Sequence, residues 1–156
     1  MPRITPNLWF DTESEEAAQF YVSIFPNSKI TAVTHYTEVG PREAGLVLTV
    51  DFELDGQPFT AINGGPDFTF NEATSLLVNC ADQAEIDHYW EKLGEGGEHG
   101  PCGWLKDRYG FSWQVAPAGL EDLMTGDDAR RNRVMTALLG MRKLDLAALQ
   151  AAAGAG

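Results

Sequence analysis

The sequence predicts an α+β protein in which a strand–helix–strand–strand–strand module occurs twice and is followed by helices. Two observations lead to this prediction: the order of elements starts again after residue 73, and the closing strands F-T-A-I-N and F-S-W-Q-V are similar. Such a duplication bears on function, because paired modules can curl their sheets around one shared cavity. Within one domain of 156 residues, we expect the first module at residues 3–67, the second at 74–118, and a helical extension at 119–150.

The elements of the first module are predicted from alternation in the strands and from helical spacing between them. Segment Glu15–Phe25 has apolar residues at helical spacing and a Glu pair at its positive N-terminal end. The short polar residues of Asp11–Ser14 are candidates for its N-cap. Pro6 suggests an edge or a bulge in the first strand. The predicted strands are Ile4–Phe10, Lys29–Thr37, Gly45–Leu54 and Gln57–Ile62.

The second module repeats this order with one uncertain strand. Thr74–Cys80 is a predicted strand, Asp82 a predicted cap, and Ala84–Leu93 a helix with one apolar stripe. The glycine-rich segment Gly94–Pro101 is either a mobile loop or contains a short strand.

A hairpin closes this module, with strands at Gly103–Lys106 and Phe111–Ala116 around a turn at residues 107–110. Gly110 supplies the positive φ that such a turn needs. In the second strand the apolar residues Phe111, Trp113 and Val115 alternate with the polar Ser112 and Gln114.

The remaining residues are predicted to form amphipathic helices. A short helix is expected around Leu120–Met124, a second at Ala129–Met141 after the capping pair Asp127-Asp128, and a third at Lys143–Ala152. These helices either cover the sheet of their own domain or pack against a second subunit.

Charge and composition exclude several classes of partner. The net charge of −12 argues against binding to nucleic acid or anionic membranes, which require lysine and arginine, and is compatible with a cationic ligand. Cys80 and Cys102 form no disulfide framework and fit a reducing compartment. Since no secretory signal pattern and no membrane-length apolar run occur in the sequence, we expect a cytoplasmic protein.

Motifs for common catalytic chemistries are absent from the sequence. There is no G-x-S-x-G, no phosphate-binding Walker loop and no dinucleotide-binding unit. His99-x-x-Cys102 can hold zinc only with partners from elsewhere. Cys102, with Lys106 nearby, is either an activated thiol or an ordinary turn residue, and the second alternative is favoured.

Several motifs resemble those of the PhnB-like branch of the vicinal oxygen chelate superfamily, which also contains glyoxalase I, extradiol dioxygenases and bleomycin resistance proteins. The similar motifs are L-W-F-D with E-E-A-A-Q-F-Y, F-P-N-S, F-E-L-D-G-Q-P-F, N-G-G-P-x-F-x-F-N-E and G-W-L-K-D-R-Y-G-x-S-W-Q-V-x-P, and the resemblance extends over about residues 3 to 150. It implies paired βαβββ modules of glyoxalase/bleomycin resistance type and a homodimer. This branch is often labelled 3-demethylubiquinone-9 3-methyltransferase, but the sequence lacks the glycine-rich S-adenosylmethionine loop of Rossmann-type methyltransferases.

The resemblance also implies where metal-using members place their ligands. These places fall near Pro6, Ile62, Thr74 and Gln114, of which Gln114 alone is a weak ligand. We therefore expect no metal and no cofactor, and a protein that binds a small molecule, as bleomycin resistance proteins bind a cationic drug without metal. The alternatives are a metal-assisted enzyme of lyase, isomerase or dioxygenase type, and a structural dimer whose own side chains fill the cavity.

The candidate ligand-binding residues follow from the alternation of the closing strand and from the resemblance. Since the last ligand place of the superfamily maps to Gln114, the face with Gln114 and Ser112 is expected to line the cavity, and Trp113 to pack under a helix. The other candidates for the cavity lining are Asn63, Trp9, Trp104 and Cys102.

Overall fold

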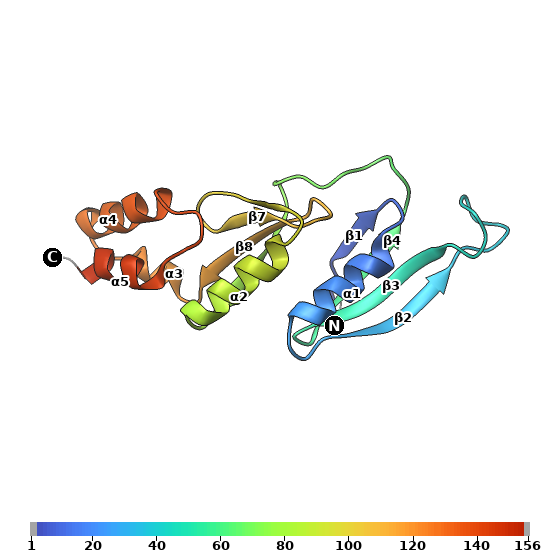
Figure 1. The fold of residues 1–156 in the computed structure, drawn as a ribbon, viewed down its shortest axis with the longest axis horizontal. Helices are drawn as coiled ribbons and strands as arrows, with labels where there is room; N and C mark the ends of the chain where they lie inside the picture. The colour runs from blue at the N-terminus through green and yellow to red at the C-terminus, as the bar shows by residue number, and fades with distance from the viewer. Residues whose placement is uncertain (1–2, 155–156) are drawn as a thin grey trace. The chain divides into compact units, whose positions relative to one another are not determined.

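The computed structural model describes residues 3–154 and divides into two compact units, one ending at Phe70 and the other beginning at Asn71. Each unit contains a four-stranded mixed sheet with one helix packed on it (Figure 1). Both units follow the order strand, helix, strand, strand, strand, and in the second unit further helices follow the last strand. The predicted α+β fold of two βαβββ modules with C-terminal helices is confirmed.

The first unit has the strand order β1-β4-β3-β2, in which β1 runs parallel to β4 and the other pairs are antiparallel. Its elements are β1 (Asn7–Phe10), α1 (Ser14–Ile24), β2 (Lys29–His35), β3 (Val47–Leu54) and β4 (Gln57–Asn63). The first strand starts three residues later than predicted because Pro6 has no N–H to donate. Instead, the Pro6 carbonyl accepts a hydrogen bond from the Thr60 N–H at 2.9 Å.

The core of the first unit lies between α1 and one face of the sheet. Tyr21 of α1 is 1% exposed, and its ring centroid lies 6.3 Å from that of Phe52 on β3. Burial of each large apolar side chain contributes about 1.5–3 kcal/mol. The sheet residues on this face are Leu8, Phe10, Val50, Phe52, Leu54, Phe59, Ala61 and Asn63.

A side chain from the end of β4 accepts a hydrogen bond from a backbone N–H group at the start of α1. Asn63 Oδ1 accepts a hydrogen bond from the Ser14 N–H at 2.9 Å, and Asn63 Nδ2 donates to the Val47 carbonyl at 3.0 Å. The N-cap residue is Glu13, which makes no side-chain capping bond. The predicted side-chain cap within Asp11–Ser14 is therefore wrong. Asn63, which lies 49 positions away in the sequence, accepts the hydrogen bond instead, because the start of α1 is buried against β4.

The second unit has the strand order β5-β8-β7-β6, with β5 parallel to β8. Its elements are β5 (Ser75–Cys80), α2 (Gln83–Gly94), β6 (Glu98–His99), β7 (Trp104–Lys106) and β8 (Ser112–Pro117). The glycine-rich segment before the hairpin does contain a short strand, β6. Asp82 caps α2 as predicted, with its side chain accepting the Glu85 N–H at 2.9 Å.

The buried carboxylate of Asp107 organises the hairpin between β7 and β8. Its Oδ1 accepts the backbone N–H groups of Tyr109 and Phe111 at 2.9 and 3.0 Å, and its Oδ2 accepts the indole N–H of Trp113 at 2.9 Å. Asp107 is 2% exposed. Burial of a carboxylate is costly unless hydrogen bonds replace its water, and these three do so. Gly110 has the predicted positive φ, +82°.

The C-terminal helices α3 (Leu120–Leu123), α4 (Asp128–Leu139) and α5 (Leu146–Gly154) belong to the second unit, where they pack against the end of β8. Their buried cluster joins Ala116 at the end of β8 to Val134, Leu144 and Leu149. The backbone between α4 and α5 is also tied to the hairpin, because the N–H groups of Cys102 and Gly103 donate to the carbonyls of Met141 and Arg142 at 2.8 Å each. Among residues 3–154, no helix has the length and apolar character needed to cross a bilayer.

We predict that Trp113→Ala lowers the free energy of unfolding by about 3–5 kcal/mol, because it leaves a cavity where a large side chain is 2% exposed. Trp104→Ala, in the same hairpin but partly exposed, serves as the control and should cost clearly less. Urea unfolding followed by circular dichroism measures both. Equal losses in the two variants would contradict this description of the hairpin.

Candidate functional site

The face of the second sheet that turns away from α2 collects most of the polar and aromatic candidates. Trp104 pairs with Gln114, and Lys106 with Ser112, across β7 and β8, so these four side chains share one face. Trp113 lies on the opposite, helix-covered face, and Gln114 is partly exposed. The predicted division of faces is confirmed. The full open face consists of Ser75, Leu77, Asn79, Glu98, Trp104, Lys106, Ser112, Gln114 and Ala116.

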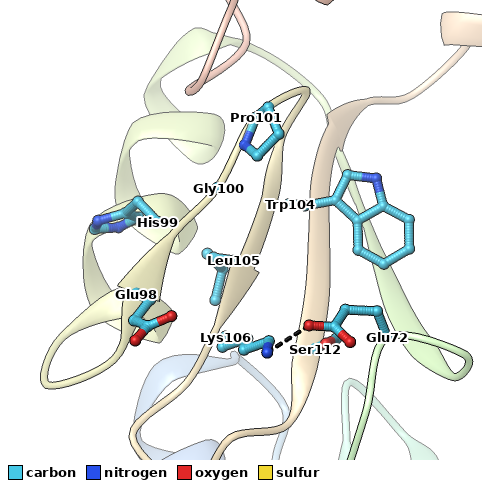
Figure 2. Close-up of a pocket in the computed structure, with 9 residues that line it drawn as sticks. All are labelled: Glu72, Glu98, His99, Gly100, Pro101, Trp104, Leu105, Lys106 and Ser112. Carbon is cyan, nitrogen blue, oxygen red and sulfur yellow. Dashed lines mark ion pairs between the residues drawn. The ribbon is translucent and has the colours of Figure 1, made fainter.

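A pocket of about 320 Å³ lies along β6, β7 and β8 (Figure 2). Figure 2 shows Trp104 on one side of this pocket and Pro101 at its end, with the polar groups gathered near Lys106. We call it the hairpin pocket. Its lining residues are Glu72, Glu98, His99, Gly100, Pro101, Trp104, Leu105, Lys106 and Ser112.

Ser112 gives the hairpin pocket an unused polar group. The residue is 1% exposed, and its Oγ has no hydrogen-bond partner among the described residues. A buried hydroxyl without a partner costs about 1–3 kcal/mol. Because this oxygen is itself buried, a ligand group in the pocket would remove this cost only after neighbouring side chains move.

The ion pair between Lys106 and Glu72 lies beside Ser112 (Figure 2). The hydrogen bond between the two side chains is the main cause that holds the pKa of Glu72 below its usual value and raises the pKa of Lys106. Both side chains are substantially exposed, so their pairing contributes little to stability. The pair can therefore open for a ligand without loss of the fold.

A second pocket, of about 240 Å³, lies where the open face meets the C-terminal helices. Trp104 lines this pocket as well as the hairpin pocket. Gln114 lies in it and donates from Nε2 to Ser75 Oγ at 2.9 Å. We call it the extension pocket. It is lined by Leu77, Asn79, Cys102, Trp104, Gln114, Ala116, Pro117, Leu120, Glu121 and Leu138.

Cys102 lies in the extension pocket, where it serves the backbone turn. Its φ is +58°, and its Sγ lies 3.5 Å from the Leu138 carbonyl. Gly103 follows it because a Cβ there would come within 2.7 Å of the Val115 carbonyl oxygen. Both observations favour a structural role for Cys102 over an activated thiol.

In the first unit, Trp9 packs against the N-G-G-P segment. Its indole N–H donates to the Gly65 carbonyl at 2.9 Å, and its ring meets Phe68 edge-on with centroids 5.0 Å apart. A Cβ at Gly64 would lie 2.3 Å from the indole ring, so this close approach requires glycine. Trp9 is paired with Ile62 on the face of the first sheet that turns away from α1. Its predicted role in lining a ligand cavity stays a prediction.

Asn63 does not line an open face, contrary to our expectation. Side chains alternate along β4, so Ile62 takes the open face and Asn63 turns toward α1. Asn63 is 1% exposed, and its amide is occupied by Ser14 and Val47. Its role is to hold the helix and β3 in place.

The residues at the implied metal places do not fit a divalent ion. Pro6 and Ile62 offer no side-chain ligand, and the amide of Gln114 is a weak one. His99 and Cys102 are not paired: the His99 ring stacks on Trp90 with centroids 4.5 Å apart. Within residues 3–154, no group of three His, Cys, Asp or Glu is close enough to hold a metal.

Sequence reasoning missed the contributions of Glu72, Glu121 and Leu138 to these pockets. Glu72 precedes the second module, and the other two belong to the helices beyond it. Lys106 could have been predicted, because it lies two residues after Trp104 on the same strand and therefore shares its face. The others are brought in by tertiary contacts with no local pattern.

Comparisons with solved structures support the fold. The chain is 38% identical to the PhnB protein of Bacillus cereus, with a TM-score of 0.67 over 75% of this chain and 100% of that one. Protein PA1353 of Pseudomonas aeruginosa is 19% identical, with a TM-score of 0.63 over 76% and 99%. The fosfomycin resistance protein FosX of Listeria monocytogenes, solved with Mn(II) and sulfate, is 13% identical, with a TM-score of 0.56 over 79% and 94%. The last two show the fold alone.

No curated protein matches the chain. The sequence model of the family described as 3-demethylubiquinone-9 3-methyltransferase matches residues 2–116. The match ends before the C-terminal helices, which the resemblance was expected to include. The chain belongs to this family, in the PhnB-like branch of the vicinal oxygen chelate superfamily.

Proposed function

We propose that this protein binds a small molecule on the open face of its second sheet, without a resident divalent metal. The observation that carries the proposal is Ser112, which lines a pocket walled by Trp104 and whose buried hydroxyl has no hydrogen-bond partner within residues 3–154. Ligand sites commonly combine such an aromatic wall with a few convergent polar groups.

The size of the hairpin pocket supports a ligand with two fused rings. An apolar cavity of about 150 Å³ accepts benzene. The hairpin pocket has about twice that volume, roughly 320 Å³, and Trp104 and Leu105 give it apolar walls. Ser112 would orient the ligand through one hydrogen bond.

Binding is favoured over catalysis by the surroundings of Ser112. An activated serine nucleophile is hydrogen-bonded to a general base. Ser112 Oγ has no such partner in the described part of the chain, and the nearby Lys106 is paired with Glu72. These groups therefore suit recognition better than group transfer.

The alternative is a metal-assisted enzyme on a small metabolite. The fold it shares with FosX, which was solved with Mn(II), favours this alternative. Against it stand the apolar or neutral residues Pro6, Ile62, Thr74 and Gln114 at the implied ligand places.

Methyl transfer, which the family description names, has no support from the loops after the first strands. Rossmann-type methyltransferases bind S-adenosylmethionine at a glycine-rich loop. Here β1 is followed by Asp11-Thr12-Glu13 and β5 by Ala81-Asp82, without glycine.

We predict that 2-naphthylmethanol, a neutral two-ring probe, binds at Trp104. In protein labelled with 5-fluorotryptophan, ¹⁹F NMR should show a shift of one of the four tryptophan resonances, assigned by Trp104→Phe. Ser112→Ala should weaken binding about fivefold, since one hydrogen bond is worth about 1 kcal/mol. Ser23→Ala, on an exposed position of α1, is the matched control.

Two outcomes would contradict the proposal. One is that the Trp104 resonance does not move at millimolar probe, which would mean that the open face takes no such ligand. The other is that Ser112→Ala and Ser23→Ala bind the probe equally, which would remove the role of the buried hydroxyl.

A homodimer is also part of the proposal, as the family resemblance implies. Met135 and Leu139 lie one turn apart on α4 and are 40% and 65% exposed. An isologous contact between two α4 helices would bury both.

We predict a mass of twice the 17.1 kDa chain by light scattering at micromolar concentration. Leu139→Glu should shift it toward one chain, because a charge would enter the contact. Val39→Glu, 95% exposed in the first unit, is the control and should stay dimeric. A single-chain mass for the unmodified protein would exclude the dimer.

A further inference from the structure

The extension pocket is built mostly by the family core and partly by the C-terminal helices. Leu77 and Gln114 come from β5 and β8, whereas Leu120, Glu121 and Leu138 come from α3 and α4. The family match ends at residue 116. This pocket therefore contains walls that the matched region does not supply.

The added walls are held firmly in place. The backbone N–H groups of Cys102 and Gly103 donate to Met141 and Arg142, and Cys102 Sγ contacts the Leu138 carbonyl. Buried apolar packing around Ala116 anchors the same helices. The pocket is thus a formed feature of the second unit.

The polar groups of the extension pocket favour a positively charged donor. The lining residues include Glu121, Gln114 and Asn79, and no lysine, arginine or histidine. Gln114 uses an N–H for Ser75, while its amide oxygen accepts no hydrogen bond from the described residues. The face of Trp104 adds an electron-rich surface that attracts cations.

We propose that the extension pocket is an amine-binding subsite, in which Glu121 is the counter-ion, Gln114 accepts an N–H, and Leu138 closes the pocket. The ligand is an amine whose apolar body lies against Trp104. This inference rests on the proposed binding function and adds its ligand class. The net charge of −12 further raises the local concentration of cations.

The test compares two probes that differ in one group: 2-naphthylmethylamine, charged at pH 7.5, and the neutral 2-naphthylmethanol. Binding is followed through the ¹⁹F resonance of Trp104. We expect the amine to bind at least tenfold more tightly than the alcohol. Glu121→Gln should reduce this preference at least threefold and leave alcohol binding unchanged, since the side chain keeps its size and loses its charge while the Trp104 face and the other charges remain.

Two matched controls separate the site from general effects. Asp122→Asn removes one charge from the neighbouring residue, which does not line the pocket, and should keep the preference. Leu138→Phe should fill the pocket and reduce amine affinity at least tenfold, whereas Leu139→Phe, 65% exposed, should not. Thermal unfolding checks that each variant is folded.

The outcomes distinguish this inference from the function on which it rests. If neither probe shifts the Trp104 resonance, the binding function itself fails, and the subsite with it. If both probes bind equally and Glu121→Gln changes neither, binding stands and the amine subsite is wrong. Equal loss of preference in Glu121→Gln and Asp122→Asn would also overturn the subsite, because general charge would explain it.

Discussion

The hydrogen bond between the buried Asp107 carboxylate and the Trp113 indole fixes which way β8 faces. Because Trp113 is held on the helix side, strand alternation turns Ser112 and Gln114 to the opposite side. The same carboxylate closes the turn through the N–H groups of Tyr109 and Phe111. One buried charge thus sets the hairpin, the packing of α2 and the polar face on which both pockets lie.

The first module uses a different polar residue for a comparable purpose. Asn63, at the end of its closing strand, joins the start of α1 to β3 through its amide. Both devices place a hydrogen-bonded polar group in a core, where an unpaired one would be costly. Asn63 and Asp107 both lie in motifs that are typical of this family. Their hydrogen bonds show that such motif residues can stabilise the fold without contacting a ligand.

Strand alternation and helix spacing were sufficient to predict both modules, and the family resemblance was needed in addition to predict the face on which Gln114 lies. The role of Asn63 could not be predicted, because a one-residue difference in the strand end decides whether its side chain meets a helix or an open face. The extension pocket could not be predicted either, because it depends on the contact between Leu138 and Cys102, which lie 36 positions apart in the sequence. Ser112 was predicted as polar lining, but its lack of a partner is visible only in three dimensions.

The family description names methyl transfer, whereas the proposed function is the binding of a small molecule. Native mass spectrometry of the untagged protein, as purified and after addition of 2-naphthylmethanol, tests this account most directly. It predicts no divalent metal in the purified protein and one bound probe per chain after addition. One equivalent of manganese, zinc or iron per chain, or no bound probe at millimolar concentration, would contradict it.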